Sequence, residues 1–89
     1  MVEVAFSSTF RKVFNKHTRK NKLLEKKFWE KLEVFITDPF HSSLRTHKLS
    51  GRLDKLWSYS VDYDCRVIFY FDTSKKVVFI DIGTHDEVY

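Results

Sequence analysis

A length of 89 residues gives the chain room for one small domain, and its nine Phe, four Tyr and two Trp can build the core. A hydrophobic content of 43% with only two Gly and one Pro excludes a disordered or collagen-like protein. No run of about 18 apolar residues indicates a membrane-spanning helix. The composition therefore predicts a single soluble domain over residues 1–89.

The net charge of +4 is unevenly distributed. Residues 1–52 carry 12 basic and 5 acidic side chains (+7), whereas residues 53–89 carry 4 and 7 (−3). Clustered Lys and Arg indicate a protein that binds nucleic acid or an acidic partner. Composition does not separate these two classes.

Cysteine content and the first residues bear on the cellular compartment. Cys65 is the only cysteine, so the chain has no internal disulfide and no cysteine-based zinc site. The apolar stretch at residues 1–6 is too short for a secretory signal peptide. We therefore expect a cytoplasmic protein, and the scattered His residues predict no metal site and no cofactor.

The first half of the chain predicts a strand followed by two helices. Apolar side chains alternate over residues 2–6, the pattern of a short strand with one buried face. Ser7–Thr9 offer candidate N-caps for a first helix. A second helix is predicted from about Asn21 to Ile36 by its apolar stripe, and Thr37–Pro39 ends it. The many Lys and Arg between the stripes predict a positively charged outer surface, for which simple solvation is the plainer interpretation.

The second half predicts three strands. They follow a polar loop and are, in order, Leu56–Val61, Val67–Phe71 and Val77–Ile82. The second is continuously apolar, which favours a central strand covered on both faces. Hairpin-length connections make these strands antiparallel. The order β-α-α-β-β-β predicts an α+β fold, with a helical hairpin packed against a mainly antiparallel twisted sheet.

The last seven residues, Gly83–Tyr89, contain the first candidate for chemistry. His85 carries an imidazole, which can give or take a proton near neutral pH. Gly83 is expected to free the backbone just before it. A lone loop histidine is more often merely exposed, so its surroundings decide the interpretation.

Arg66 is the second candidate, because a guanidinium at the start of an apolar strand needs an anionic partner. A carboxylate such as Asp62 or Asp64 and a bound phosphate are both compatible with this position. Asp64 is also a common type of turn former. Cys65 is expected to be a small buried hydrophobic residue.

Three further residues are candidates for contacts with RNA. Tyr89 can stack on a base or donate from its phenol, although a frayed end is common at such a position. His47 and Lys48 can reach a phosphate backbone, although simple exposure explains them as well. Trp57 and Tyr59 are expected in the core.

These segments together resemble the RelE/ParE superfamily of bacterial toxins, and within it most closely the YafQ-type branch. The resemblance covers nearly the whole chain and is carried by His47–Gly51, Trp57–Asp64, Arg66–Phe69 and Gly83–Tyr89. It implies a RelE-like fold and a type II toxin-antitoxin system. It also implies a ribosome-dependent mRNA endonuclease that is neutralised by a small co-expressed antitoxin.

The resemblance assigns roles residue by residue. His85 matches the YafQ-type histidine proposed to protonate the leaving oxygen, and His47 matches an upstream histidine of that branch. Asp64 matches the active-site aspartate of that branch, and Tyr89 falls where it has an aromatic residue. Arg66 matches the strand arginine that RelE and YoeB relatives use near the scissile phosphate.

The chain departs from the YafQ pattern at Ser60, where another active-site histidine is expected, and at Asp81, where an arginine is expected. Arg66 can supply the positive charge missing at Asp81. The implied reaction is metal-independent attack of a ribose 2′-hydroxyl on the adjacent phosphate. The RNA-binding residues we expect are Lys48, Arg52, Arg45, Lys20 and Lys22.

The implied partners are a cognate antitoxin, in a hetero-oligomer, and the ribosome with its mRNA, without any membrane. Two other functions stay open. One is a ParE-like inhibitor of DNA gyrase, against which His85 argues. The other is a degenerate toxin that only binds its antitoxin, which Ser60 and Asp81 keep open.

Overall fold

The computed structural model describes residues 1–51 and 55–89. Arg52, one of the expected RNA-binding residues, lies outside the described residues. The elements follow in the order β1 (Glu3–Phe6), α1 (Ser8–Thr18), α2 (Lys22–Thr37), the short 3₁₀ helix η1 (Ser42–Leu44), β2 (His47–Lys48), β3 (Trp57–Ser60), β4 (Arg66–Thr73), β5 (Lys76–Gly83) and α3 (His85–Val88).

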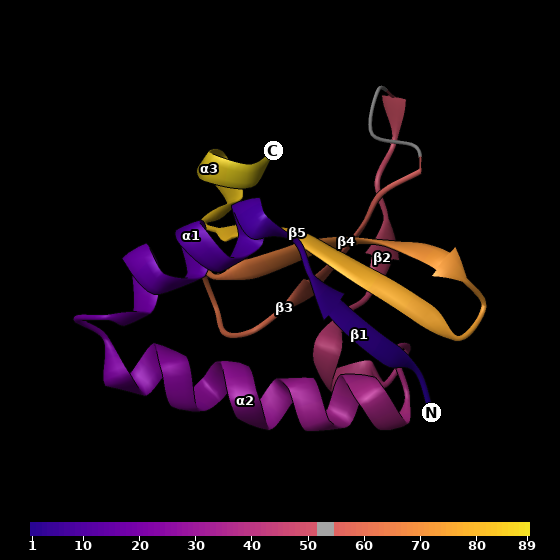
Figure 1. The fold of residues 1–89 in the computed structure, drawn as a ribbon, viewed down its shortest axis with the longest axis horizontal. Helices are drawn as coiled ribbons and strands as arrows, with labels where there is room; N and C mark the ends of the chain where they lie inside the picture. Colours follow the sequence, from indigo (N-terminus) through magenta and orange to yellow (C-terminus); the bar gives the residue numbers. More distant parts are fainter. Residues whose placement is uncertain (52–54) are drawn as a thin grey trace.

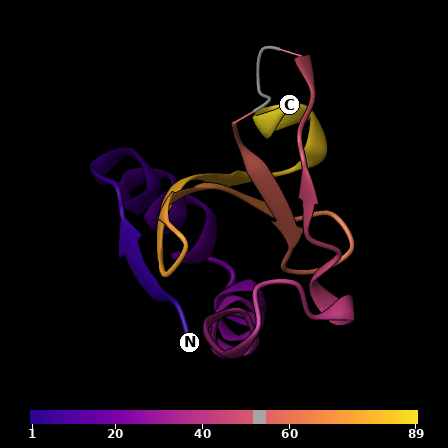
Figure 2. The same cartoon turned by 90° about the vertical axis from the view of Figure 1, so that its right-hand side faces the viewer.

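The strands form one sheet in the order β1-β5-β4-β3-β2 (Figure 1). β1 pairs with β5 in parallel, and the other neighbouring strands are antiparallel. The helical hairpin α1–α2 connects β1 to the later strands, and α2 runs along one side of the sheet while α3 lies on the other (Figures 1 and 2). The predicted α+β fold with a mainly antiparallel sheet is confirmed.

Both long helices begin where a polar side chain caps them. Ser7 Oγ accepts from the Phe10 backbone N–H at 3.0 Å, and Asn21 Oδ1 accepts from the Leu24 N–H at 3.1 Å. The apolar stripe of α2 is buried as predicted, and the helix ends one residue beyond Ile36. None of the described helices has the length and apolar character needed to cross a lipid bilayer.

The core is aromatic and lies between the helical hairpin and the sheet. Phe35 of α2 packs 5.0 Å from the ring of Tyr59 and 5.0 Å from that of Phe69, measured between ring centroids. All three side chains are fully buried, which confirms the core position of Tyr59. Trp57 is only half-buried and packs edge-on against Phe71 at the border of this core. Aromatic pairs of this kind give a small domain much of its buried area.

The structure adds three short elements that the sequence pattern left as loops, namely η1, β2 and α3. β4 lies in the middle of the described sheet, as predicted, but it is fully buried only over Val67–Phe69. Tyr70 and Phe71 are half-buried. α3 packs on β4 and β5 near the start of β4, so only that part is covered on both faces.

Candidate active site

Alternation along the strands gives the sheet two faces. Tyr59, Val67 and Ile82 pair across β3, β4 and β5 and point into the core. Their neighbours in sequence therefore point to the opposite side, here called the open face, which lies away from α2 (Figure 2). Two rows of paired residues lie on the open face, the first being His47, Ser58, Ile68 and Asp81 and the second Ser60, Arg66 and Gly83.

The predicted residues His85 and Tyr89 meet on this face. The Tyr89 hydroxyl donates a hydrogen bond to Ser58 Oγ, which joins α3 to the first row. The His85 ring packs edge-on against the Tyr89 ring, with 4.4 Å between centroids. The His85 side chain is 62% exposed, and its Nδ1 lies 3.7 Å from a carboxylate oxygen of Asp86. Tyr89 is thus held at both its ring and its hydroxyl, and its ring orients an imidazole that solvent can reach.

A capping box fixes α3 at the end of β5. Thr84 Oγ1 accepts from the Glu87 N–H at 3.3 Å, and Glu87 Oε1 accepts from the Thr84 N–H at 2.8 Å. His17 Nε2 on α1 lies 3.6 Å from the same Glu87 oxygen. The hydrogen bond from the Thr84 backbone lowers the pKa of the Glu87 carboxyl, and the nearby His17 adds to this effect. α3 is therefore tied to both β5 and α1.

Gly83 serves this junction for a different reason from the one expected. Its backbone is outside the left-handed region, so no special conformational freedom is used. A Cβ at this position would lie 2.9 Å from Glu87 Oε1 and 3.2 Å from Val88 Cγ1. Glycine fits this position because Glu87 and Val88 of α3 pack closely against it.

Arg66 does not form the carboxylate pair that was one of its two expected arrangements. Its Nη1 donates to Ser60 Oγ at 2.8 Å, and within residues 1–51 and 55–89 no carboxylate lies within ion-pair distance of it. Asp62 Oδ1 instead accepts from the Asp64 and Cys65 backbone N–H groups, and its other oxygen lies 3.9 Å from Lys27 Nζ. The guanidinium therefore keeps donors for an outside anion.

Asp64 and His47 lie in different parts of the candidate site. Asp64 is exposed in the β3–β4 turn and lines a cleft of about 230 Å³ together with Gly83 and Thr84. His47 is exposed on the short strand β2, directly beside Ser58, and its Nδ1 contacts the Arg45 carbonyl oxygen at 3.0 Å. Of these two residues, only His47 belongs to the first row, which also contains Ser58, the residue that is hydrogen-bonded to Tyr89.

The four expected RNA-binding residues that lie in the described part of the chain do not form one cluster. Lys48 pairs with Trp57 and so points to the face opposite His47. Lys20 and Lys22 lie at the turn between α1 and α2, where Lys22 Nζ is 3.6 Å from Glu25. Among them, Arg45 is the one that lines the same pocket as Arg66.

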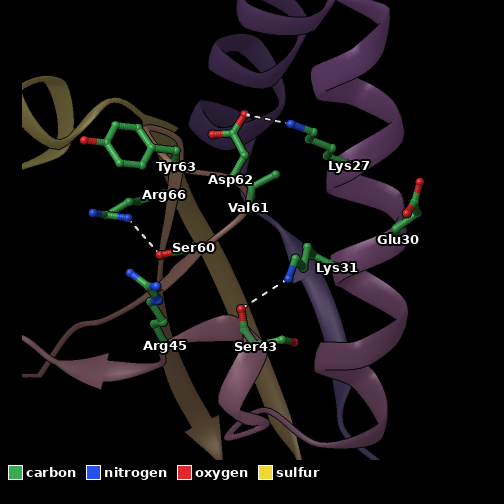
Figure 3. A pocket seen from close by; sticks show the side chains of 10 residues that line it. All are labelled: Lys27, Glu30, Lys31, Ser43, Arg45, Ser60, Val61, Asp62, Tyr63 and Arg66. Carbon is green, nitrogen blue, oxygen red and sulfur yellow. Dashed lines mark hydrogen bonds and ion pairs between the residues drawn. The ribbon is translucent and has the colours of Figure 1, made fainter.

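This pocket has a volume of about 460 Å³ and opens between α2 and the edge of β3 (Figure 3). Lys27 and Lys31 reach it from α2, whereas Arg45 and Arg66 reach it from the sheet side (Figure 3). Tyr63, which is 98% exposed, stands at its border.

Ser58, Tyr63 and Lys31 were missed as site residues by the reasoning from sequence. Ser58 and Ser60 alternate with Trp57 and Tyr59, so the polar face of β3 was visible in the sequence. No local pattern, however, indicated that Lys31 of α2 and Tyr63 would border one pocket.

Cys65 is buried, as expected, and burial raises the pKa of its thiol to about 12 with help from the carboxylates of Asp62 and Asp64. Among the described residues, no three His, Cys, Asp or Glu side chains are grouped closely enough to hold a metal ion.

Solved structures share this fold at low sequence identity. A YoeB/ParE toxin from Agrobacterium tumefaciens is 14% identical, with a TM-score of 0.78, and the match covers 94% of this chain and 99% of that one. YafQ from Escherichia coli strain BL21(DE3) is 20% identical, with a TM-score of 0.71 and coverage of 100% and 99%. A YoeB–YefM complex from Staphylococcus aureus is matched at 17% identity, with a TM-score of 0.76 and coverage of 96% and 98%.

Among curated proteins, a sequence search finds no match. The family described as the bacterial toxin of type II toxin-antitoxin system, YafQ, matches residues 2–89. The open face with His85 and Tyr89 falls within that match, as does the complete sheet. The chain belongs to the YafQ family of toxins of bacterial type II toxin-antitoxin systems.

Proposed function

We propose that this toxin is a ribosome-dependent endoribonuclease that cleaves translated mRNA by attack of a ribose 2′-hydroxyl. The observation that carries the proposal is the arrangement on the open face. An exposed His85 is oriented by Tyr89, which is bonded to the first row of the open face. Arg66 lies in the second row and has no carboxylate partner among the described residues. A proton donor and an uncompensated cation are what cleavage of a phosphodiester requires.

In this mechanism the 2′-oxygen attacks the phosphorus, and the bond from phosphorus to the 5′-oxygen breaks. The products are a 2′,3′-cyclic phosphate and a free 5′-hydroxyl. Arg66 stabilises the anionic transition state, and His85 gives its proton to the leaving 5′-oxygen. Each role contributes on the order of a hundredfold or more.

His47 is the better placed of the two candidates for accepting the proton of the 2′-hydroxyl. It lies beside Ser58 in the row to which Tyr89 is bonded. Asp64 instead lines the separate cleft that Gly83 and Thr84 also line. Tyr89 positions a nucleotide with its ring, as aromatic side chains do for single-stranded RNA.

The toxin is proposed to be held inactive by a cognate antitoxin in a hetero-oligomer. In Staphylococcus aureus, the toxin YoeB, which has the same fold, forms a heterotetrameric complex with the antitoxin YefM. The chain's surplus of positive charge lies in residues 1–52, which complements an acidic antitoxin segment. Lys20 and Lys22, exposed at the tip of the helical hairpin, would meet ribosomal RNA electrostatically.

Mapping of mRNA 5′ ends after brief induction tests the proposal. We expect new in-frame cuts in translated messages that disappear when translation is blocked. His85→Gln and Arg66→Ala should each abolish cutting and growth inhibition while antitoxin binding persists. Lys75→Ala, which removes a charge at the exposed β4–β5 turn, is the matched control and should cut normally.

The other functions give different results in the same experiment. A gyrase inhibitor stops growth and blocks plasmid relaxation by purified gyrase without new mRNA ends. A degenerate toxin binds antitoxin and does neither. Full toxicity of both His85→Gln and Arg66→Ala contradicts the assignment of the site.

A further inference from the structure

The pocket between α2 and β3 contains more positive charge than its own acidic residues neutralise. Four cationic side chains line it, whereas Glu30 and Asp62 are its only described acidic ones, which leaves an excess of +2. Asp62 lies near Lys27 at 3.9 Å, and Lys31 Nζ donates to the Ser43 carbonyl oxygen at 3.2 Å (Figure 3). Like charges that line one pocket favour binding of an anion, which reduces their mutual repulsion.

Arg45 gives an independent indication of function. Its backbone has φ 52°, the left-handed region, at the point where η1 ends and the chain turns into β2. An arginine here costs on the order of 1 kcal/mol compared with glycine, the residue that usually ends a helix in this conformation. The Arg45 side chain extends along the pocket wall toward Ser60 and Arg66 (Figure 3). A costly residue that places a guanidinium in a pocket indicates a role for that side chain.

From these features we propose that the pocket is a second nucleotide subsite, which binds the phosphate and base of a nucleotide flanking the cleavage position. Arg45 and Lys31 bind the phosphate, and the exposed ring of Tyr63 stacks on the base. The pocket volume of about 460 Å³ is within the range of small-molecule sites. Because Arg66 lines this pocket and also stands on the open face, an RNA strand bound at the scissile phosphate continues directly into it.

The subsite rests on the proposed endoribonuclease function, since it takes Arg66 as the contact to the scissile phosphate. An acidic peptide is the competing occupant, because carboxylates also bind Arg and Lys. The exposed Tyr63 ring beside the cations favours the nucleotide, which offers an anion and a flat ring together.

Equilibrium binding of a fluorescent 2′-O-methyl RNA hexanucleotide tests the subsite without cleavage, because the attacking hydroxyl is blocked. Lys31→Ala and Arg45→Gly should each weaken binding roughly three- to tenfold, and Tyr63→Leu roughly fivefold or more. Glu30→Gln should strengthen binding. Lys75→Ala, which removes the same charge far from the pocket, should have no effect.

Two further readouts separate a subsite from a structural effect. Arg45→Gly should raise the thermal midpoint, so weaker binding by this variant is not due to unfolding. It should also reduce the slope of log Kd against log salt by about 0.7, the value expected when the protein neutralises one phosphate fewer on a single strand.

Specific outcomes overturn the subsite. It is wrong if the wild type binds no hexanucleotide, if Lys75→Ala weakens binding as much as Lys31→Ala, or if a hexaglutamate peptide displaces the RNA at equal concentration. These outcomes are distinguishable from failure of the proposed function. If the wild type cuts translated mRNA and the Arg45→Gly and Lys31→Ala variants bind RNA as well as the wild type does, only the subsite is wrong. If the wild type cuts no mRNA, the proposed function itself is wrong.

Discussion

The hydroxyl of Tyr89 donates to Ser58 Oγ across 31 residues of sequence, and this contact joins the end of α3 to strand β3. Ser58 is fully buried, whereas Tyr89 is 41% exposed. Without Ser58, the exposed tyrosine can bond to water instead. Without Tyr89, the buried serine hydroxyl has no partner, because water does not reach it. Loss of the Tyr89 hydroxyl therefore costs more stability than loss of the Ser58 hydroxyl.

Tyr89→Phe should consequently destabilise the protein more than Ser58→Ala. We expect about 1–3 kcal/mol for the first and about 0.5–1 kcal/mol for the second in the free energy of unfolding. The double variant should have about the stability of Ser58→Ala, because it removes the Ser58 hydroxyl that Tyr89→Phe alone leaves without a partner. Urea unfolding of all four proteins measures this cycle, and additive losses would show that the two hydroxyls do not interact.

Gly83→Ala should displace α3 and with it the imidazole of His85. The added methyl group would lie 2.9 Å from Glu87 Oε1, which the capping box holds in place, and 3.1 Å from Glu87 Cβ, so Glu87 has to move. We expect at least a tenfold loss of mRNA cleavage with the sheet intact, measured by single-turnover cutting on programmed ribosomes. Gly51→Ala is the matched control, because no atom of the described residues lies within 4 Å of its Cβ position, although its φ of 68° costs some stability. Normal cutting by Gly83→Ala contradicts the role of this junction.

Docking of α3 should weaken in acid through Glu87. The pKa of this carboxyl is lowered in the folded protein, chiefly by the hydrogen bond from the Thr84 backbone. Its contribution to stability is therefore present above the ordinary carboxyl pKa of about 4.3 and is lost as pH falls through the lower folded value. Exchange protection of the Tyr89 amide, which donates to the His85 carbonyl at 3.0 Å, should fall in that window.

The control for this acid effect is the neighbouring residue Asp86, which is fully exposed. Glu87→Gln should give weak protection that no longer changes over the same pH range, whereas Asp86→Asn should keep the wild-type profile. An unchanged profile in Glu87→Gln would assign the acid effect to other groups.

The sequence was informative where a residue's role depends on periodicity. The stripe of α2 and the buried ring of Tyr59 follow from spacings of 3.6 and 2, so they could be predicted without tertiary information. α3 was missed although Thr84 and Glu87 have the spacing of a capping box. At four residues, this helix is too short for any periodicity to show.

The site was predictable by residue type but not by contact. His85, Arg66 and Tyr89 were identified from chemistry and resemblance, yet their immediate partners come from strand register. Arg66 bonds to Ser60 because β3 and β4 pair these two residues directly, and a one-residue shift would have turned Ser60 to the other face. Register of this kind is decided by packing across the whole sheet, which a local pattern does not contain.

Cys65 should be unreactive in the folded toxin. Burial raises the pKa of its thiol to about 12, so almost no thiolate exists near neutral pH. We expect iodoacetamide to modify the folded protein at pH 8 at least a hundredfold more slowly than the urea-unfolded protein, as followed by mass spectrometry. Rapid labelling of the folded chain would show that the turn at residues 62–65 opens.

Asp81 provides the sharpest electrostatic test of the open face. It pairs with Ile68 in the row that contains Ser58, so its carboxylate lies on the face where the phosphate is proposed to bind. Its Oδ1 accepts from the Ile82 N–H at 2.9 Å. Asp81→Asn can keep that hydrogen bond through its amide oxygen and removes only the charge.

A unit charge about 10 Å from a phosphate, at an effective dielectric constant near 40, contributes about 0.8 kcal/mol of repulsion. Asp81→Asn should therefore speed single-turnover cleavage at subsaturating toxin about two- to fivefold at low salt. Asp72→Asn removes the same charge from the distant end of β4, where screening makes it ineffective, so it is the matched control. The gain should shrink in 0.3 M salt, as expected for a surface charge. Equal acceleration by both variants would indicate an effect of net charge, and slower cleavage by Asp81→Asn would place the phosphate elsewhere.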